Sequence, residues 1–575
     1  MSAFFGVYFK GSLGVERARA GISEVKVRIF GDRALADGVW SEGYVANGFV
    51  VHYDLGAYGQ GTGFQSKPGS LTVLAGHPYL DSCLGDSRLS QTGALVDAVT
   101  QGGYEGLRAA RGSYAMAHLS QESGSLLLVT DVLGIRPLYY AVDGECVVFA
   151  TTISVVRKLL NHPIEVDLRG TTETAVMGFA LGERTTDAAI HCVEGGVALE
   201  VSAVGITRRQ YWRWKQELKP PVDEPTALKL VYETFLAAVR IRLEDDRESL
   251  GFLTGGLDSR CVVSAVQISG AKVQTINFAE TGSQDLELGA SLAAAMGVTH
   301  YSCPMPMAPI AEKIAGAMTL WRRWLSRAGA KVARQSIVWS GDGGSLGLGH
   351  IYLNDEIVTK AKSGLSGEAV SLLISENFWV APVGIFKDTF AGILSEVPMK
   401  GLMEELRALD LPANGRDIHA LLMVTDQRRH MHDHYERIYE HGCEMHLPFF
   451  DRDFVTAVLS QPIQPFLAHR FYNRWLTLFP KEVSTVAWQA YPLHEPCPLP
   501  IPEGLHTQWS AATIGPSLKQ RIKTSWVAAT DVLAGHYRGT PVSALKLLTA
   551  ALLTGVGFGD YSYALKAARH YRARN

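Results

Sequence analysis

Residues 251–260 read GFLTGGLDSR, and this stretch decides how the surrounding sequence is interpreted. Two glycines, an aspartate and a serine follow a short apolar run, which is typical of a strand that ends in a glycine loop and leads into a helix. One interpretation of the loop is a plain tight turn. The other is a phosphate-binding loop, because glycine lets backbone N–H groups approach an anion and the following helix directs its positive end to the same place.

The sequence on either side of the loop favours the second interpretation. Helix and strand patterns alternate there, with helices at 226–244, 259–269 and 286–297 and strands at 249–253, 272–278 and 299–305. Strands that alternate with helices indicate βαβ units around a parallel sheet. We therefore expect the loop to bind pyrophosphate, and the absence of G-K-[ST] excludes a Walker loop.

The residue types in the loop predict specific roles. We expect Gly255 and Gly256 to adopt positive φ angles, and Thr254 and Ser259 to supply hydroxyl donors. Asp258 would bind a magnesium ion that neutralises the phosphates.

The rest of the chain divides by its patterns. Residues 4–214 carry short apolar runs separated by glycine, which predict strands of an antiparallel, layered domain. The segment KQELKPPVDEP at 215–225 is charged and contains a proline pair, so it marks a boundary. Helical patterns dominate from 310 to 470, and a basic, alanine-rich end looks like a helical tail. We predict domains at 1–214, 225–500 and 501–575.

Composition excludes several classes of protein. Hydrophobic residues make up 47% of the 575 residues and charged residues 19%, which is typical of a globular protein. The formal net charge of −3 does not indicate a general polyanion binder, so no nucleic-acid partner is expected. The opening lacks a signal-peptide pattern and the most apolar late stretch, 544–558, is too short to span a bilayer. We expect a cytoplasmic protein with no membrane partner.

Cysteines and histidines give no metal signature. The seven cysteines are scattered without a CxxC pair, which favours reduced thiols over disulfides or structural zinc. In HMHDH at 430–434, a spacing of two points neighbouring imidazoles to different sides of a helix. A polar helix in contact with other parts of the fold is the favoured interpretation.

Several motifs together resemble those of the asparagine synthetase family. TGGLDS resembles its S-G-G-x-D-S pyrophosphate loop. Four other stretches resemble segments of the family and follow the family's order along residues 1–495. Two of them resemble the glutaminase-type domain: residues 112–154, which contain GIRPLYY and VVFAT, and residues 168–196. The other two are SGDGGSLGLG at 340–349 and CEMHLPFFD at 443–451.

The resemblance implies an α/β multidomain fold. Its first domain would be an Ntn-type, glutaminase-like antiparallel αββα sandwich of the class II amidotransferase type. The second would be an adenine-nucleotide α-hydrolase-like (PP-loop) synthetase domain with a parallel sheet. The cofactors implied are ATP and Mg²⁺, with Asp258 as the metal ligand and Asp342 as the catalytic base. The implied ATP and pyrophosphate site comprises Leu253, Thr254, Gly255, Gly256, Leu257, Asp258, Ser259, Phe278, Ser340, Gly341 and Gly343.

The chain also departs from the family pattern. Ser2 occupies the position of the cysteine nucleophile of the glutaminase domain, and GHPYLD at 76–81 replaces a segment that helps to hold glutamine. Since serine is a weaker nucleophile than a thiolate, we expect the glutaminase to be inactive. Ser345 replaces the second magnesium aspartate and Leu346 the adjoining glutamate. The late oxyanion lysine has no match, because no lysine lies between Lys481 and Lys519; His494 or an arginine would have to replace it.

These features predict an AMP-forming carbon–nitrogen ligase. It would adenylate a substrate carboxylate, release pyrophosphate and couple the acyl group to an amine. Relatives with a silent first domain include β-lactam synthetases and the cyclases of lasso peptides, so the substrate would be a small molecule or a precursor peptide, with precursor-processing proteins as candidate partners. The alternatives are a glutamine-hydrolysing asparagine synthase and a non-catalytic nucleotide-binding homologue.

Overall fold

The computed structural model describes residues 2–10, 38–59, 62–80, 88–160, 163, 165–244, 246, 248–306, 308–328, 336–509 and 517–573. The chain forms two compact units that interleave along the sequence. Unit 1 comprises Met1–Leu159, Val193–Asn354 and Leu422–Gln508, and unit 2 comprises Leu160–Cys192, Asp355–Leu421 and Trp509–Asn575. The predicted domain boundaries stay a prediction.

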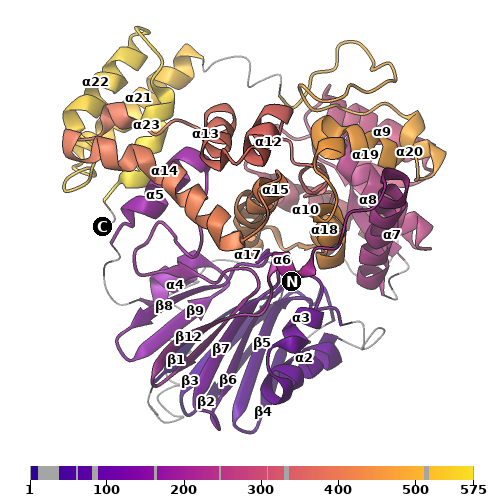
Figure 1. The fold of residues 1–575 in the computed structure, drawn as a ribbon, viewed down its shortest axis with the longest axis horizontal. Helices are drawn as coiled ribbons and strands as arrows, with labels where there is room; N and C mark the ends of the chain where they lie inside the picture. The colour runs from indigo at the N-terminus through magenta and orange to yellow at the C-terminus, as the bar shows by residue number, and fades with distance from the viewer. Residues whose placement is uncertain are drawn as a thin grey trace. The chain divides into compact units, whose positions relative to one another are not determined.

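The first part of unit 1 contains two antiparallel sheets (Figure 1). One has the order β8 (Tyr139–Asp143), β9 (Cys146–Ala150), β1 (Ser2–Phe9), β3 (Gly48–Asp54) and β2 (Val39–Val45). The other has the order β12 (Gly205–Gln210), β11 (Val197–Ser202), β7 (Ser125–Thr130), β6 (Tyr114–Ser120), β5 (Ser70–Gly76) and β4 (Phe64–Lys67). Apolar side chains of both sheets, among them Phe4, Val73 and Leu128, form one buried core. Helices α2 (Arg88–Gly102), α3 (Glu105–Ala109) and α4 (Ile153–Leu159) accompany the sheets.

The second part of unit 1 contains a parallel sheet of five strands. Its order is β15 (Thr299–Ser302), β14 (Lys272–Asn277), β13 (Glu248–Phe252), β16 (Ile337–Trp339) and β17 (Glu444–His446), and every neighbouring pair is parallel. The helices α7 (Glu224–Leu243), α8 (Leu257–Ile268), α9 (Gln284–Ala295) and α10 (Ile310–Ala328) alternate with the strands in sequence. The predicted α/β multidomain class, with antiparallel sheets first and a parallel sheet second, is confirmed.

Local sequence explains where these helices begin. Helix α7 starts in the predicted boundary segment, since the Asp223 side chain accepts from the Thr226 N–H and a proline occupies the first turn. Helix α8 begins two residues earlier than predicted, because Gly256 serves as its N-cap.

Unit 2 is helical. It contains α5 (Leu168–Met177), α12 (Asp355–Lys362), α13 (Ser366–Asn377) and α14 (Asp388–Leu409), and the predicted helical tail forms α21 (Leu518–Leu533), α22 (Ala544–Gly555) and α23 (Ser562–Ala568). Leu394 of α14 and Leu547 and Leu565 of the tail share one core. Across the described parts of the chain, no helix has both the length and the apolar character needed to cross a membrane.

Candidate active site

The glycine loop lies at the carboxyl edge of the parallel sheet, at its centre. Residues 253–256 join β13 to α8, and β13 lies between β14 and β16. Phe278 and Ser340 follow those two neighbouring strands, so they lie at the same edge as the loop. The ring of Phe278 meets that of Phe252 edge-on, with 5.2 Å between centroids. Ligands of open α/β sheets bind outside the carboxyl ends of the strands, which is where these residues gather.

The two loop glycines do not adopt the predicted backbone conformation. Gly256 has φ −79° and ψ −179°, and Gly255 also lies outside the positive-φ region. The expectation of positive φ was therefore wrong. Gly255 is required for space instead, because a Cβ there would lie 2.4 Å from the carbonyl oxygen of Gln284 at the start of α9. Gly256 begins α8 without a side-chain cap, which leaves the first N–H groups of the helix without a hydroxyl or carboxylate partner from the N-cap.

Hydroxyl groups fix the shape of the loop. The Ser259 Oγ accepts from the Thr254 N–H at 3.0 Å, and the two hydroxyl oxygens lie 3.2 Å apart. The Thr254 Oγ1 also accepts from the Gly256 N–H at 3.3 Å. Leu253 and Leu257 are buried beneath this polar turn. That the two hydroxyls also donate to a ligand stays a prediction.

Asp258 is the half-buried carboxylate of the loop, and two hydroxyl groups hold it. Its Oδ1 accepts from Ser345 Oγ and from Tyr472 Oη, each at 2.8 Å. Burial raises the pKa of Asp258 to about 6, although both hydrogen bonds favour the carboxylate. The backbone of α11 (Gly344–Gly347) approaches closely, since a Cβ on Gly344 would lie 2.5 Å from Asp258 Cγ. Asp258 therefore connects the glycine loop with residues 340–347.

Asp342 lies beside this contact and is accessible to solvent. Its side chain is 37% exposed, and its Oδ2 accepts from Ser340 Oγ at 2.5 Å. Its Oδ1 lies 4.0 Å from Nε2 of His430, an exposed residue of α16 (Arg428–Glu436). The charge of Asp342 is one of the factors that raise the pKa of Asp258. An oriented, accessible carboxylate of this kind is suited to accept a proton.

Two further glycines allow the second loop to pack closely. A Cβ on Gly341 would lie 2.5 Å from the Ser259 nitrogen, so only glycine permits this approach to the first loop. Gly343 has φ +89°, and a Cβ there would lie 2.7 Å from the ring of Phe450. The predicted residues of the two loops are thus brought together at one site.

Arg260 holds the loop from the protein interior. It is fully buried, and its Nε, Nη1 and Nη2 atoms make five hydrogen bonds to backbone carbonyls. The acceptors are Gly256, Val483, Val486, Gly255 and Ala487, at 2.8–3.4 Å. Burial lowers the pKa of Arg260 to about 10, so the group remains charged at neutral pH. Because a guanidinium has five N–H donors, this arrangement uses its whole capacity.

Two known protein families match stretches of this chain. The family described as "Glutamine amidotransferase domain" matches residues 87–212, and the family described as "Asparagine synthase" matches residues 230–328. The two matches occur in the order in which the antiparallel and parallel sheets occur. The resemblance to the asparagine synthetase family is confirmed for these two regions.

Individual relatives of this family are similar over part of the chain. "Asparagine synthetase [glutamine-hydrolyzing] 1" of Bacillus subtilis is 27% identical over 33% of this chain and 30% of its own length. "Putative asparagine synthetase [glutamine-hydrolyzing] 2" of Methanocaldococcus jannaschii is 23% identical over 34% of this chain and 39% of its own length. The matched region thus spans about a third of the curated relatives.

A solved glutamine phosphoribosylpyrophosphate amidotransferase from B. subtilis, complexed with ADP and GMP, is also similar. The match covers 65% of this chain and 79% of that protein, at 11% identity and a TM-score of 0.23.

The structure describes the positions at which this chain departs from the pattern of the asparagine synthetase family. Ser345, in place of the second magnesium aspartate, gives Asp258 a neutral hydrogen-bond donor in place of a negative charge. His494 is a poor replacement for the late lysine, because burial lowers the pKa of its imidazole and disfavours the cation. Ser2 begins β1, where its backbone pairs with Asp54 of β3, and its side chain lies outside what the structure describes.

Sequence reasoning missed three contributors to the site. Tyr472 comes from α19 (Arg470–Leu476), more than two hundred residues after Asp258, and no local pattern distinguishes it from a core tyrosine. No role was predicted for Arg260, which directly follows the loop. His430 was interpreted as part of a polar helix, and only the tertiary structure brings it near Asp342.

Proposed function

We propose that this asparagine synthetase family member is an ATP-dependent ligase that adenylates a carboxylate and transfers the acyl group to an amine. The observation that carries the proposal is the packing of two glycine-rich loops at the sheet edge. They bring Asp258, the uncapped start of α8 and the accessible Asp342 to one site. Helix N-termini favour the binding of phosphate oxygens, and a nearby accessible carboxylate can accept a proton from the attacking amine.

The residues fit a single magnesium ion. Asp258 accepts hydrogen bonds from the hydroxyl groups of Ser345 and Tyr472, which orient it without a competing charge. Magnesium is commonly held by one or two carboxylates together with substrate phosphates and water, so one protein carboxylate suffices. When bound, the ion would neutralise phosphate charge as pyrophosphate leaves.

The chain's own groups would carry the two steps as follows. The loop at 254–259 holds the phosphates of ATP while an oxygen of the substrate carboxylate attacks the α-phosphorus and pyrophosphate departs. The amine nitrogen then attacks the acyl carbon, AMP departs, and Asp342 accepts the proton that the nitrogen loses. Fixed loops and oriented donors contribute to rate through positioning and charge stabilisation.

We propose further that the amidotransferase-like part serves as a structural partner and not as a source of ammonia. A row of aromatic rings fills the space where it meets the parallel sheet: neighbouring centroids lie 4.5 Å apart for Trp339–His446, 6.0 Å for His446–Tyr58, 5.3 Å for Tyr58–His77 and 4.1 Å for His77–Tyr79. His77 and Tyr79 belong to the GHPYLD segment that replaces the glutamine-holding sequence. If ammonia does not come from glutamine, the amine belongs to the substrate. The specific reaction that we propose is then an intramolecular coupling, such as the macrolactam closure of a lasso peptide.

The test is pyrophosphate release by the full-length protein with Mg·ATP and a panel of carboxylates, including L-aspartate with ammonium and peptides with an acidic side chain and a free N-terminus. We expect release with one class, its loss in Asp258→Asn, and unchanged release in Asp433→Asn, a control at an exposed aspartate of α16. If the wild type binds no ATP analogue, the proposal is wrong.

A second arm separates the alternatives. Release of glutamate from glutamine that Ser2→Ala abolishes would identify a glutamine-hydrolysing asparagine synthase. Binding of ATP without pyrophosphate release in any combination would identify a non-catalytic homologue.

A further inference from the structure

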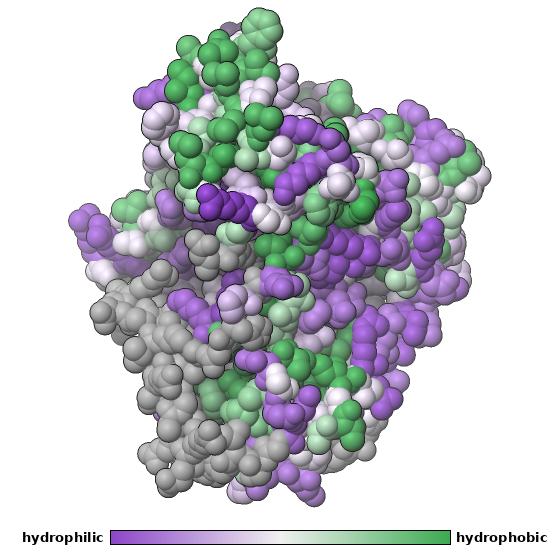
Figure 2. All heavy atoms as spheres, turned by 90° about the vertical axis from the view of Figure 1, so that its left-hand side faces the viewer, coloured by the Kyte–Doolittle hydropathy of each residue, from purple (hydrophilic) through white to green (hydrophobic). Residues whose placement is uncertain are grey.

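Large apolar side chains gather on the outer surface of the C-terminal helices of unit 2 (Figure 2, upper part). Eight of them on α21, α22 and the turn after α22 are more than half exposed. They are Leu518, Ile522, Trp526, Leu533, Leu545, Leu552, Val556 and Phe558. Soluble proteins rarely leave so many large apolar groups together, so this surface calls for a partner.

The spacing of these residues places them in one stripe on each helix. At about 100° per residue, Leu518, Ile522, Trp526 and Leu533 fall within roughly 80° of one another around α21. Leu545 and Leu552 of α22 differ by only about 20°. The buried residues of α21 are Ser525, Ala528 and Asp531, and they lie about 20°, 80° and 140° from Leu518 in the direction away from Trp526. We call the two stripes, together with Val556 and Phe558, the apolar face.

The two helices run beside each other. A Cβ on Gly555, at the end of α22, would lie 3.5 Å from the Cβ of Ser525 in α21. A short connection at 534–543 joins the end of α21 to the start of α22, so the pair is antiparallel. Leu533 therefore lies near the end that carries Leu545, and Trp526 near the end that carries Val556.

The segment of the chain that carries the apolar face has an excess of cations. Residues 517–573 contain eight Lys and Arg against two Asp, although the whole chain has a net charge of −3. One of the two aspartates, Asp531, is buried and paired with Arg572. Lys519 and Lys523 are exposed and follow the edge of the α21 stripe, at about 100° and 140° from Leu518. The occupant of this surface must be apolar in its centre and anionic around it.

These properties discriminate between occupants. A second copy would bring the same cations against themselves across a symmetric interface, which repels. A protein partner would normally exchange about one hydrogen bond per 100–200 Å² with such a face. The stripe positions offer no side-chain donor or acceptor except the Trp526 indole, and the helical backbones bond internally. Trp, Phe and Leu flanked by lysines are typical of helices that lie in the interface of a bilayer.

We propose that the apolar face of α21 and α22 docks peripherally on a membrane that contains anionic lipids. The apolar side chains enter the boundary between headgroups and acyl chains, and Lys519 and Lys523 contact the headgroups. This inference does not depend on the proposed ligase activity. It also differs from spanning, for which the described helices are unsuited, and it departs from the expectation, drawn from the sequence, of no membrane partner.

The test is co-sedimentation of the full-length protein with phosphatidylcholine vesicles, with and without phosphatidylglycerol. We expect binding that requires phosphatidylglycerol and weakens with salt. The double variant Trp526→Ser/Phe558→Ser should lose most of the binding, while Val204→Ser, a control at a nearly fully exposed valine of unit 1, should not. Lys519→Gln/Lys523→Gln should weaken binding by about 25-fold, since each cation near an anionic surface contributes about fivefold.

Three outcomes would overturn the inference. The first is no sedimentation with anionic vesicles. The second is binding that the Trp526→Ser/Phe558→Ser variant retains. The third is a concentration-dependent dimer that this variant abolishes while vesicles remain unbound, which would identify a second copy as the occupant. Circular dichroism of each variant establishes that the exposed substitutions leave the fold intact.

Discussion

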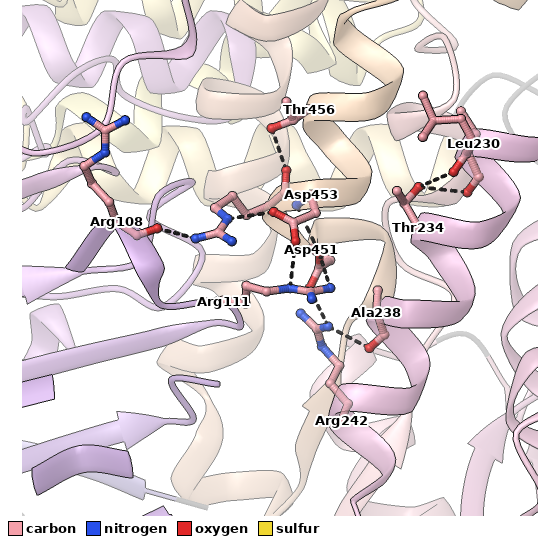
Figure 3. A network of polar contacts seen from close by, with 11 residues as sticks. Arg108, Arg111, Leu230, Thr234, Ala238, Arg242, Asp451, Asp453 and Thr456 are labelled. Carbon is pink, nitrogen blue, oxygen red and sulfur yellow. Dashed lines mark hydrogen bonds and ion pairs between the residues drawn. The ribbon is translucent and has the colours of Figure 1, made fainter. Parts of the chain in front are cut away.

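Asp451 provides the sharpest test of how unit 1 is held together. It is fully buried and accepts from Arg111 Nη2 at 2.9 Å and Nε at 3.2 Å and from Arg242 Nη1 at 2.8 Å (Figure 3). Arg111 comes from the antiparallel part of unit 1 and Arg242 from α7. Burial alone would raise the pKa of Asp451, but the two guanidinium groups lower it below its ordinary value. The charged form is therefore the one that the fold stabilises.

The substitution Asp451→Asn keeps the shape and removes the charge. It removes the buried counter-charge of Arg242 and leaves Arg111 only the half-exposed Asp453, and breaking a buried pair in this way costs about 3–5 kcal/mol of unfolding free energy. The measurement is urea unfolding of the full-length protein, followed by tryptophan fluorescence. The folded state lowers the pKa of Asp451, so its charge stabilises the fold at pH values above the pKa of the unfolded state. The wild type should lose this stabilisation as the pH falls from the unfolded-state pKa through the lower folded-state pKa, while Asp451→Asn should not.

Asp453 supplies the matched control. It belongs to the same network, with Arg452 Nε at 2.8 Å and Arg111 Nε at 3.3 Å, but it is 39% exposed. Exposed pairs contribute about 0–1 kcal/mol, so Asp453→Asn should have a small effect. If the two substitutions destabilise unit 1 equally, the argument that the buried charges depend on one another is refuted.

Three further predictions concern the candidate active site. Arg260→Met should weaken binding of a non-hydrolysable Mg·ATP analogue by about 10–100-fold, because the loop loses its anchor, and Arg260→Lys should restore part of it; unchanged affinity by calorimetry would contradict this. Tyr472→Phe removes a hydrogen bond that lowers the pKa of Asp258, so the loss of Mg·ATP-analogue affinity near pH 6 should move to higher pH; a pH series of calorimetric titrations measures the shift, and superimposable profiles would count against it. Ser345→Asp places a second carboxylate beside Asp258, so it should lower the melting temperature without magnesium and make it rise more steeply with added magnesium, whereas Ser345→Ala should show no gain.

Much of the site could be predicted from the sequence because its signals are local. The apolar run before 254, the glycine pair and the helix pattern after it follow from neighbouring residues, and they appear as β13, the loop and α8. The predicted positive φ failed because the need for Gly255 depends on Gln284, a neighbour through space. Tyr472 and Arg260 could not be assigned for the same reason, since their partners come from distant helices and loops.

The division of the chain into two interleaved units could not be predicted from the sequence either. Residues 355–421 and the C-terminal tail each show an ordinary helical pattern, and periodicity alone does not tell which helices share a core. The π-helical turn Met423–Gln427, which leads into α16, also has no signature in the sequence. The apolar face was missed because an amphipathic stripe normally predicts a buried side, and only the structure reveals that this one is exposed.

The amidotransferase-like part remains necessary even if it hydrolyses nothing. Glu444 of the parallel sheet is fully buried and pairs with Arg136 at 2.5 Å, and the carboxylate of Glu436 in α16 accepts from the Ile153 N–H at the start of α4. Removing residues 1–214 would take Arg136 from Glu444 and Arg111 from Asp451. A buried charge that loses its partner lowers the free energy of unfolding. The antiparallel and parallel parts also contact each other closely enough to form one compact unit. The first domain therefore contributes to the candidate active site indirectly: through Glu444 it supports the β17 strand beside β16, from which the loop carrying Asp342 departs.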